Sequence, residues 1–247
     1  MSGHSKWAQI KRQKGANDAR KGAVFTRLAR ELQVAAREGG TDPAGNARLR
    51  LAIQKARAEN MPQENIRRSI ERAAGPGAEA IEEITYEGYG PGGTAILVQA
   101  ITDNRNRTVS EIRAAFTRGG GGLGEAGCVA WNFESRGVIS ISIGKRAAED
   151  IALVAIDAGA EDVNEDEFSV EVYTDPAALE RVRDALVAAD VPIESAETTI
   201  LPKSTVDLDD ERSLQVIKLV ERLENLDDVQ HVFSNLELRD ELVVGSG

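Results

Sequence analysis

The chain has 247 residues, of which 41% are apolar and 29% are charged, and its net charge is −11. This length can build one large domain or two to three small ones. No stretch of 18 apolar residues occurs, which excludes a membrane-spanning helix, and Lys and Arg interrupt the apolar residues near the start, which excludes a secretory signal peptide. The single cysteine, Cys128, cannot form an internal disulfide, so we expect a reducing, cytoplasmic environment.

The charge is divided unevenly along the chain. Residues 1–75 contain 16 Lys/Arg and 7 Asp/Glu, a net charge of +9, whereas residues 76–247 contain 14 Lys/Arg and 34 Asp/Glu, a net charge of −20. Such an asymmetry indicates that the basic part contacts a polyanion such as nucleic acid. The same partner would repel the acidic part and so orient the docking. Taken alone, the acidic excess is better explained as a solvated surface.

The first 21 residues form a segment that we call the basic arm. Residues 1–30 contain eight Lys/Arg and a single carboxylate, Asp18. Mobile cations can follow a phosphate backbone, and an aromatic ring offers a flat face on which a base can stack. The candidate nucleic-acid contacts in the basic arm are Lys6, Trp7, Lys11, Arg12, Lys14, Arg20 and Lys21.

Apolar residues recur at helical spacing in three segments around and after the end of the basic arm. The first segment includes Phe25 and stops at Gly39-Gly40, the second spans residues 49–56, and the third follows Pro62 and stops at Gly75. The short loops between them predict a helix bundle over residues 18–75. Arginines line its outer faces, and their planar fork suits phosphate, although each one singly is more typical of a solvated helix surface.

Two strands are expected next, at 83–89 and 94–102. The segment between them, residues 88–93, has the spacing G-x-G-x-x-G. A dinucleotide site requires a helix after these glycines, and a strand follows instead, so we predict a tight hairpin. A Walker phosphate loop is excluded, since no G-x-x-x-x-G-K-[ST] occurs in the sequence.

Residues 103–108 join the second strand to a helix. Thr108 and Glu111 have the spacing of a capping box, which predicts that the helix starts at Thr108. Arg105 and Arg107 belong to a basic cluster at this point, so the helix start is a candidate second phosphate contact; a capped turn with solvated arginines explains it equally well. Residues 128–133 then read as a strand, with Trp131 in the core.

Residues 137–202 show the order strand, helix, strand, strand, helix, strand, which is the ferredoxin-like pattern. The helix expected at 209–223 and the strand expected at 229–238 cannot bury their apolar faces alone, so we expect them to complete the sheet that begins at Glu83. The sequence thus predicts a multidomain α+β protein. Its domains are the basic arm with the helix bundle (1–76), a discontinuous α+β domain (77–135 and 205–247) and an inserted ferredoxin-like domain (136–204).

The sequence offers little for catalysis. The histidines are His4 and His231, and no Cys/His cluster has the spacing of metal ligands. The acidic run at 161–167 is more typical of a solvated turn than of an acid/base pair. We expect a protein that is not an enzyme, with no catalytic residue, metal site or cofactor.

Several longer motifs, in matching order, resemble the YebC/PmpR family over essentially the whole chain. They are Gly3-His4-Ser5-Lys6-Trp7, Tyr86–Gly93, Thr102–Thr108, Gly121–Gly124 and Leu226–Gln230. Cys128 departs from the serine that the family pattern has after the glycine run, which is a small change.

The resemblance implies three domains and a non-enzymatic role in gene expression. Members are commonly described as probable DNA-binding transcriptional regulators; mitochondrial relatives are similar to translational activators of cytochrome c oxidase, and bacterial ones have been placed on the ribosome. Family matching selects the basic-arm contacts Lys6, Trp7, Lys11, Lys14 and Lys21. The expected partner is therefore DNA or ribosomal RNA, and a protein–protein adaptor is the alternative from another class. We expect no membrane partner and favour a monomer.

Overall fold

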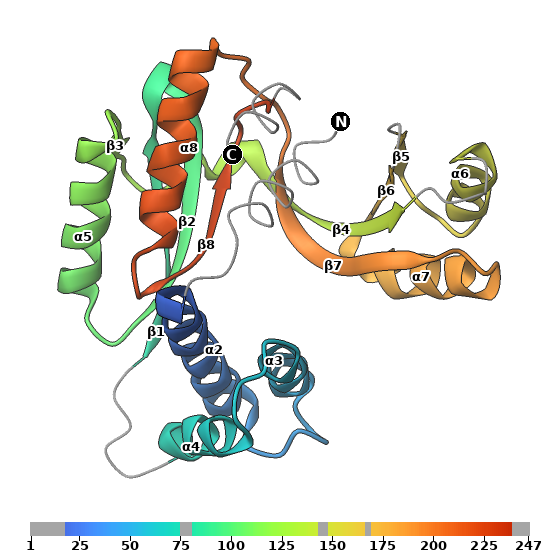
Figure 1. Ribbon diagram of the computed structural model, residues 1–247, viewed down its shortest axis with the longest axis horizontal. Coiled ribbons are helices and arrows are strands. Elements are labelled where there is room, and N and C mark those ends of the chain that lie inside the picture. Colours follow the sequence, from blue (N-terminus) through green and yellow to red (C-terminus); the bar gives the residue numbers. More distant parts are fainter. Residues whose placement is uncertain (1–17, 75–80, 143–147, 166–168, 239–247) are drawn as a thin grey trace. The chain divides into compact units, whose positions relative to one another are not determined.

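A computed structural model describes residues 18–74, 81–142, 148–165 and 169–238 (Figure 1). They divide into two compact units, which we treat separately. The larger unit comprises the described residues of 18–129 together with 214–234, and the smaller unit comprises those of 130–213 together with 235–238. Both units combine helices with antiparallel sheet, so the predicted α+β class is confirmed.

The larger unit begins with three helices, α2 (Asp18–Gly39), α3 (Ala47–Ala58) and α4 (Gln63–Ala74). Their apolar stripes meet in one core that includes Leu32, Leu49 and Ile66, so the predicted bundle is confirmed. The buried Asn46 caps α3 by accepting from the Leu49 amide, and its side-chain amide donates to Ala35 O at 2.6 Å.

A four-stranded sheet follows in the order β3-β1-β2-β8. Its strands are β1 (Glu82–Tyr89), β2 (Ala95–Thr102), β3 (Gly122–Leu123) and β8 (Val229–Ser234). The helices α5 (Arg105–Arg118) and α8 (Asp210–Glu224) pack on one face of it through Phe116 and Leu219. The glycine-rich segment closes an antiparallel β1–β2 hairpin, as predicted.

The C-terminal strand β8 pairs with β2, which confirms that the end of the chain completes the sheet that begins near Glu83. The strand ends at Ser234, whereas the sequence predicted a strand over 229–238. Two residues later, Leu236 forms a parallel bridge with Val206 instead.

Two local predictions were wrong. Residues 128–132 form turns and a 3-10 turn rather than a strand, and Trp131 is 66% exposed rather than in the core. The capping box is also absent: Asn104 caps α5, and Thr108 lies inside the helix with its hydroxyl turned to buried oxygens. The distant Glu87 holds the turn at 127–129 by accepting from the Gly127 and Val129 amides, whereas the start of α5 is set by the local cap at Asn104.

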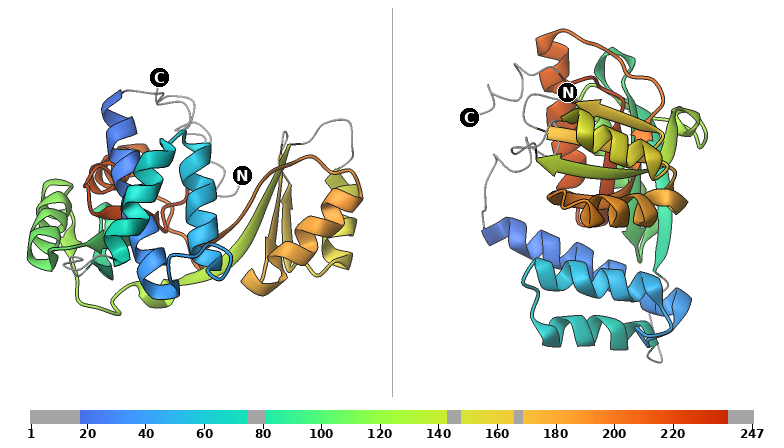
Figure 2. Two further views of the ribbon diagram at one scale, coloured as in Figure 1. Left: turned by 90° about the horizontal axis from the view of Figure 1, so that it is seen from below. Right: turned by 90° about the vertical axis from the view of Figure 1, so that its right-hand side faces the viewer.

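The smaller unit contains the βαββαβ order that the sequence predicts. Its elements are β4 (Phe133–Ser142), α6 (Ala148–Asp157), β5 (Asp162–Glu165), β6 (Ser169–Thr174), α7 (Leu179–Ala188) and β7 (Ile193–Pro202). The antiparallel sheet has the order β5-β6-β4-β7, which is the ferredoxin-like arrangement. Figure 2 shows α6 and α7 on the same side of this sheet. The three-domain boundaries given above remain a prediction.

Gly88 supplies a close backbone approach inside the larger unit. A Cβ at this position would lie 2.6 Å from Gly122 O and 2.7 Å from Phe116 Cε1, closer than real contacts allow. We expect Gly88→Ala to destabilise the protein by about 1–3 kcal/mol, measured by urea unfolding. Gly122→Ala is the matched control, because a Cβ there meets nothing within 4 Å; an equal loss in both variants would contradict this reasoning.

Candidate nucleic-acid interface

The predicted contacts fall into two groups. Five of them, Lys6, Trp7, Lys11, Arg12 and Lys14, lie outside the described residues. Arg20 and Lys21 lie in the first turn of α2, although their side chains are outside the described part. Arg105 and Arg107 lie in the first turn of α5, so the structure tests only the surroundings of these two side chains.

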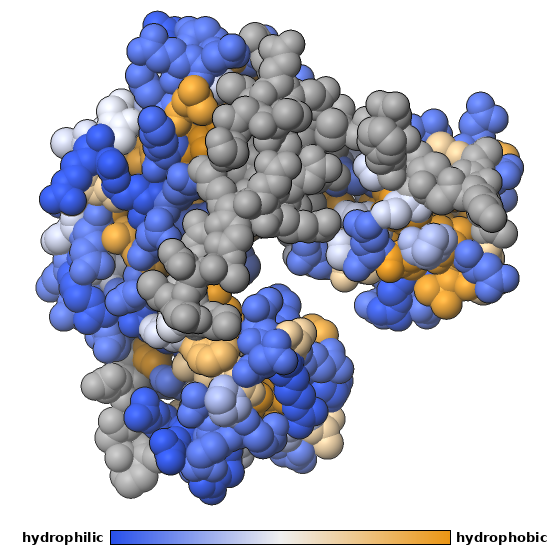
Figure 3. Space-filling model, viewed as in Figure 1, coloured by the Kyte–Doolittle hydropathy of each residue, from blue (hydrophilic) through white to orange (hydrophobic). Residues whose placement is uncertain are grey.

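The start of α5 is capped and charged. Asn104 Oδ1 accepts from the Arg107 amide at 3.1 Å. Arg105 is exposed and has no ion pair among the described residues, so its guanidinium is available to a phosphate. Figure 3 shows that the visible outer surface of α5 is hydrophilic.

Arg107 is engaged inside the protein. Its Nη2 atom lies 2.7 Å from Asp103 Oδ1 and 2.9 Å from Asp228 Oδ2. No contact from Nε or Nη1 to a described residue was found, and the side chain is 41% exposed. A guanidinium has five N–H donors, so a phosphate contact by Arg107 remains a prediction that would use this second edge.

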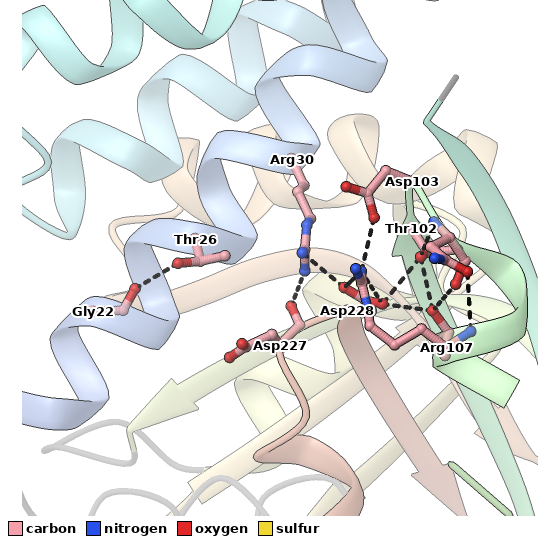
Figure 4. Close-up of polar contacts among 10 residues, drawn as sticks. Gly22, Thr26, Arg30, Thr102, Asp103, Arg107, Asp227 and Asp228 are labelled. Carbon is pink, nitrogen blue, oxygen red and sulfur yellow. Dashed lines mark hydrogen bonds and ion pairs between the residues drawn. The ribbon is translucent and has the colours of Figure 1, made fainter. Parts of the chain in front are cut away.

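Asp228 is the centre of a polar network that joins three elements (Figure 4). Its side chain is 1% exposed, and it accepts from Arg107 of α5 and from the Thr102 hydroxyl of β2 at 3.0 Å. Thr108 Oγ1 lies 2.5 Å from Asp228 Oδ2. Arg30 of α2 reaches the other carboxylate oxygen, with Nη2 at 2.7 Å from Asp228 Oδ1.

The hydrogen bonds and ion pairs of this network determine the protonation state of Asp228. Burial alone would raise the pKa of this carboxyl, but hydrogen bonds from Thr108 and Arg107 and the charge of Arg30 outweigh it and hold the pKa below its ordinary value. The same pairing raises the pKa of Arg107. Asp228 is therefore ionised at neutral pH, and it holds both arginines in fixed positions.

Helix α2 is attached to the α8–β8 connection by more than one contact. Besides Asp228, Arg30 donates to the backbone carbonyl of Asp227. One turn earlier, Arg27 Nη2 donates to Glu224 O at 2.6 Å. Because residues 18–21 at the end of the basic arm form the first turn of α2, these contacts fix the root of the arm to the larger unit.

The remaining cations of the bundle are only partly free. Arg48 pairs with Glu31, Glu38 and Glu83. Burial alone would lower the pKa of Arg48, but hydrogen bonds and charge pairing with Glu83 and Glu31 outweigh it and raise the pKa. Arg67 and Arg68 pair with carboxylates of their own helix. The exposed cations without an ion pair among the described residues of α3 and α4 are Arg50, Lys55, Arg57 and Arg72, and Arg50 donates to the Pro43 carbonyl. The bundle therefore adds few free cations to those of the basic arm.

Within the described ranges, no group of three or more His, Cys, Asp or Glu is placed to hold a metal ion. Among the helices described, none is long and apolar enough to cross a membrane.

Sequence reasoning missed the Asp228 network entirely. Its members lie as far apart in the sequence as Arg30 and Asp228, and neither Thr102 nor Asp228 stands in a charge pattern that differs from its neighbours. Thr102 and Asp228 come together because β8 pairs with β2. No local pattern in the sequence predicts the contact between these two side chains.

Two family models match the chain. The model described as TACO1/YebC protein N-terminal domain matches residues 5–76, and the model described as TACO1/YebC second and third domain matches residues 81–236. Together they cover most of the sequence.

Full-length relatives and a solved structure agree with this match. A "Probable transcriptional regulatory protein" of Roseiflexus castenholzii is 54% identical over 98% of this chain and 97% of its own length. One of Chloroflexus aggregans, with the same description, is 53% identical over 98% of both chains. The crystal structure of a conserved hypothetical protein from Aquifex aeolicus is 47% identical, with a TM-score of 0.78 over 91% of this chain and 93% of that one. The chain therefore belongs to the TACO1/YebC family.

Proposed function

We propose that this protein is a non-enzymatic regulator of gene expression that binds nucleic acid through its basic arm. The observation that carries the proposal is the charge division, +9 in residues 1–75 against −20 in the remainder. The name carried by the relatives, probable transcriptional regulatory protein, supports DNA as the target and transcription as the process.

The attachment of α2 supports the same proposal. Arg27 and Arg30 hold this helix against the α8–β8 connection, so the basic arm starts from a fixed root. A fixed root lowers the conformational entropy lost when the arm engages phosphates, since the backbone of α2 is already held in place.

Arg105 at the start of α5 supplies a second contact on the same unit. Its guanidinium is exposed at a helix N-terminus, where the helix dipole also favours an anion. Arg107 contacts the same phosphate backbone through Nε and Nη1, the guanidinium atoms that do not pair with Asp228.

The salt dependence of binding tests the proposal. If about six cations of the basic arm and its surroundings reach phosphate, log K should fall with log salt with a slope of roughly −4 to −5. A filter-binding titration of the full chain with duplex DNA and with single-stranded RNA measures this slope. A slope near zero for both nucleic acids contradicts the proposal.

Ribosomal RNA is the alternative target. A basic arm with one tryptophan can thread among phosphates and stack on unpaired bases without needing a groove. Sedimentation of a cell extract, with and without ribonuclease, separates the two targets. Co-migration with ribosomes that ribonuclease abolishes favours RNA, and unchanged migration as a small particle favours DNA.

A protein–protein adaptor is the candidate from another class, supported by the acidic remainder of the chain. Deletion of residues 1–21 distinguishes it. An adaptor keeps its regulatory effect in cells without the basic arm, whereas a nucleic-acid binder that depends on the arm loses it.

A further inference from the structure

We propose that the start of helix α5 binds a single phosphate group through the backbone amides of Arg105 and Asn106, the Arg105 guanidinium and the Tyr86 hydroxyl. We call these four groups the phosphate site. Tyr86 is new to the contact described above for Arg105. The assignment of the phosphate to nucleic acid rests on the function proposed above, whereas the binding of a phosphate group as such does not.

The first turn of α5 leaves two backbone donors free. Asn104 satisfies the other two amides of this turn, because its side-chain oxygen accepts from Arg107 N and its carbonyl accepts from Thr108 N, at 3.1 Å in both cases. The amides of Arg105 and Asn106 have no hydrogen-bond partner among the described residues. Free amides at a helix N-terminus, together with the positive end of the helix dipole, attract an anion.

The Arg105 guanidinium is the uncompensated cation at this helix start. It is exposed, and no described carboxylate forms an ion pair with it. Arg107 pairs with both Asp103 and Asp228. Arg30 also pairs with Asp228, so these two carboxylates are already compensated. The charge of Arg105 is therefore available to a phosphate.

Tyr86 on β1 supplies the observation that points to a ligand. Its side chain is 8% exposed, and its hydroxyl oxygen is buried without a hydrogen-bond partner. Native structures usually avoid such a group, because a buried hydroxyl without a partner costs free energy. Burial raises the pKa of Tyr86, so the hydroxyl stays protonated at neutral pH and can donate to an anion.

The packing of α5 on β1 places the Tyr86 hydroxyl toward the start of the helix. Gly88 lies against Phe116, and Tyr86, two residues earlier on the same face of β1, belongs to the same core as Ile112. Earlier turns of α5 therefore lie over earlier residues of β1. Arg105 lies two turns before Ile112 on this stripe, and its positive charge opposes the rise in the Tyr86 pKa, which places the two groups near each other.

A phosphate group fits this set of donors better than a carboxylate does. The donors come from two elements, α5 and β1, and a tetrahedral group offers oxygens in several directions, whereas a carboxylate accepts in one plane. Because the Tyr86 hydroxyl is buried, a phosphate oxygen reaches it only after a neighbouring side chain moves. We assign this movement to Arg105, which is exposed and can turn with the bound phosphate.

Titration of the full chain with inorganic phosphate, followed by amide NMR spectra, tests the site. With ionic strength held constant by chloride, we expect the amide signals of Arg105 and Asn106 to move and to saturate in the millimolar range. Dimethyl phosphate distinguishes two sources of the phosphate. Binding of this diester indicates a phosphate within a nucleic-acid chain, and binding of inorganic phosphate alone indicates a free or terminal phosphate. Signals that move with neither ion overturn the proposal.

Tyr86→Phe separates a ligand-binding hydroxyl from a structural one. Phosphate affinity should fall about tenfold, because a hydrogen bond to a charged group is lost. Without phosphate, the urea unfolding midpoint should not fall, since the hydroxyl that is removed has no partner. The matched control is Tyr89→Phe, which removes a hydroxyl of the same strand that donates to Cys128 O at 2.8 Å and should leave phosphate affinity unchanged. Equal phosphate affinity in Tyr86→Phe and the parent overturns the proposal.

Glu82→Gln should act in the opposite direction. Glu82 lies at the start of β1, and its negative charge helps to raise the pKa of Tyr86, so the same charge repels a phosphate held there. Its removal should tighten phosphate binding about threefold. Weaker binding in this variant contradicts the placement of the site.

Nucleic-acid affinity separates the phosphate site from the function proposed above. If the site holds a phosphate of nucleic acid, Tyr86→Phe should weaken binding of duplex DNA or single-stranded RNA about tenfold, and Tyr89→Phe should not. Weaker phosphate binding with unchanged nucleic-acid affinity supports the phosphate site and refutes its use as a nucleic-acid contact. Nucleic-acid binding that requires the basic arm, with no phosphate effect at Arg105 and Asn106, overturns the phosphate site and leaves the proposed function standing.

Discussion

Asp228→Asn is expected to destabilise the protein by about 3 kcal/mol. The substitution removes the negative charge that compensates Arg30 and Arg107 in a site where Asp228 itself is 1% exposed. Breaking a buried ion pair typically costs about 3–5 kcal/mol, and the partial exposure of Arg107 places this case at the lower end. Urea unfolding followed by circular dichroism measures the loss.

The control is Asp227→Asn, one residue away. Asp227 is exposed, and its contact with Arg30 uses the backbone carbonyl, which the substitution keeps. The unfolding midpoint of this variant should remain close to that of the parent. Equal midpoints for Asp228→Asn and the parent would show that the network contributes nothing to stability.

The pH dependence gives an independent check of the same network. The pKa of Asp228 is lowered in the folded protein, so the unfolded chain takes up this proton at a higher pH than the folded chain does. The stabilisation by Asp228 is therefore complete above about pH 4 and is lost as the pH falls through the folded pKa. The stability difference between parent and Asp228→Asn should shrink in the same range.

Lys6→Glu combined with Lys11→Glu is expected to weaken nucleic-acid binding by well over tenfold. Two phosphate contacts are lost and two carboxylates oppose the phosphates, while the helix bundle keeps its core. The slope of log K against log salt should become shallower, from about −5 to about −3, because each lost contact removes about 0.9.

The control for this variant carries the same change in charge elsewhere. Lys218→Glu with Arg222→Glu replaces two exposed cations of α8 that have no ion pair among the described residues. Its affinity should fall far less, since long-range repulsion is screened at physiological salt. Similar losses in the two variants would indicate that only net charge matters and that the arm is not the contact.

Most of the fold follows from short-range patterns in the sequence. Gly39 and Gly40 end α2 where the periodic pattern stops, and the glycines at 88–93 close the β1–β2 hairpin. The ferredoxin-like order can be predicted from the sequence because the apolar residues of each helix and each strand recur with the period of that element. These features depend on neighbours within a few residues, so local sequence patterns predict them.

Each of the failures has a physical cause. Trp131 lies in an apolar run, yet the chain turns there, and the tryptophan is left exposed. Thr108 has capping-box spacing, yet the helix starts earlier because Asn104 caps it and Asp228 engages the threonine. The turn before Trp131 is held by the distant Glu87, whose carboxylate accepts from the Gly127 and Val129 amides, and the Thr108 hydroxyl is engaged by the distant Asp228. Local propensity cannot weigh these two contacts, whereas the Asn104 cap is itself a local signal. For the candidate interface, the sequence identifies the cations, but it does not show that Asp228 holds Arg30 and Arg107.

The pairing of β8 with β2 has a consequence for synthesis of the chain. About 127 residues separate the end of β2 from the start of β8, so β8 leaves the translating machinery roughly 6–25 s after β2 at ordinary elongation rates. Throughout that interval one edge of β2 lacks its neighbour, and such an edge can pair with other nascent chains. The ferredoxin-like part of the intervening segment, residues 133–202, can fold by itself during the delay, because its six helices and strands form their own core. Slowing or truncating synthesis between these strands is therefore where we expect this protein to aggregate most.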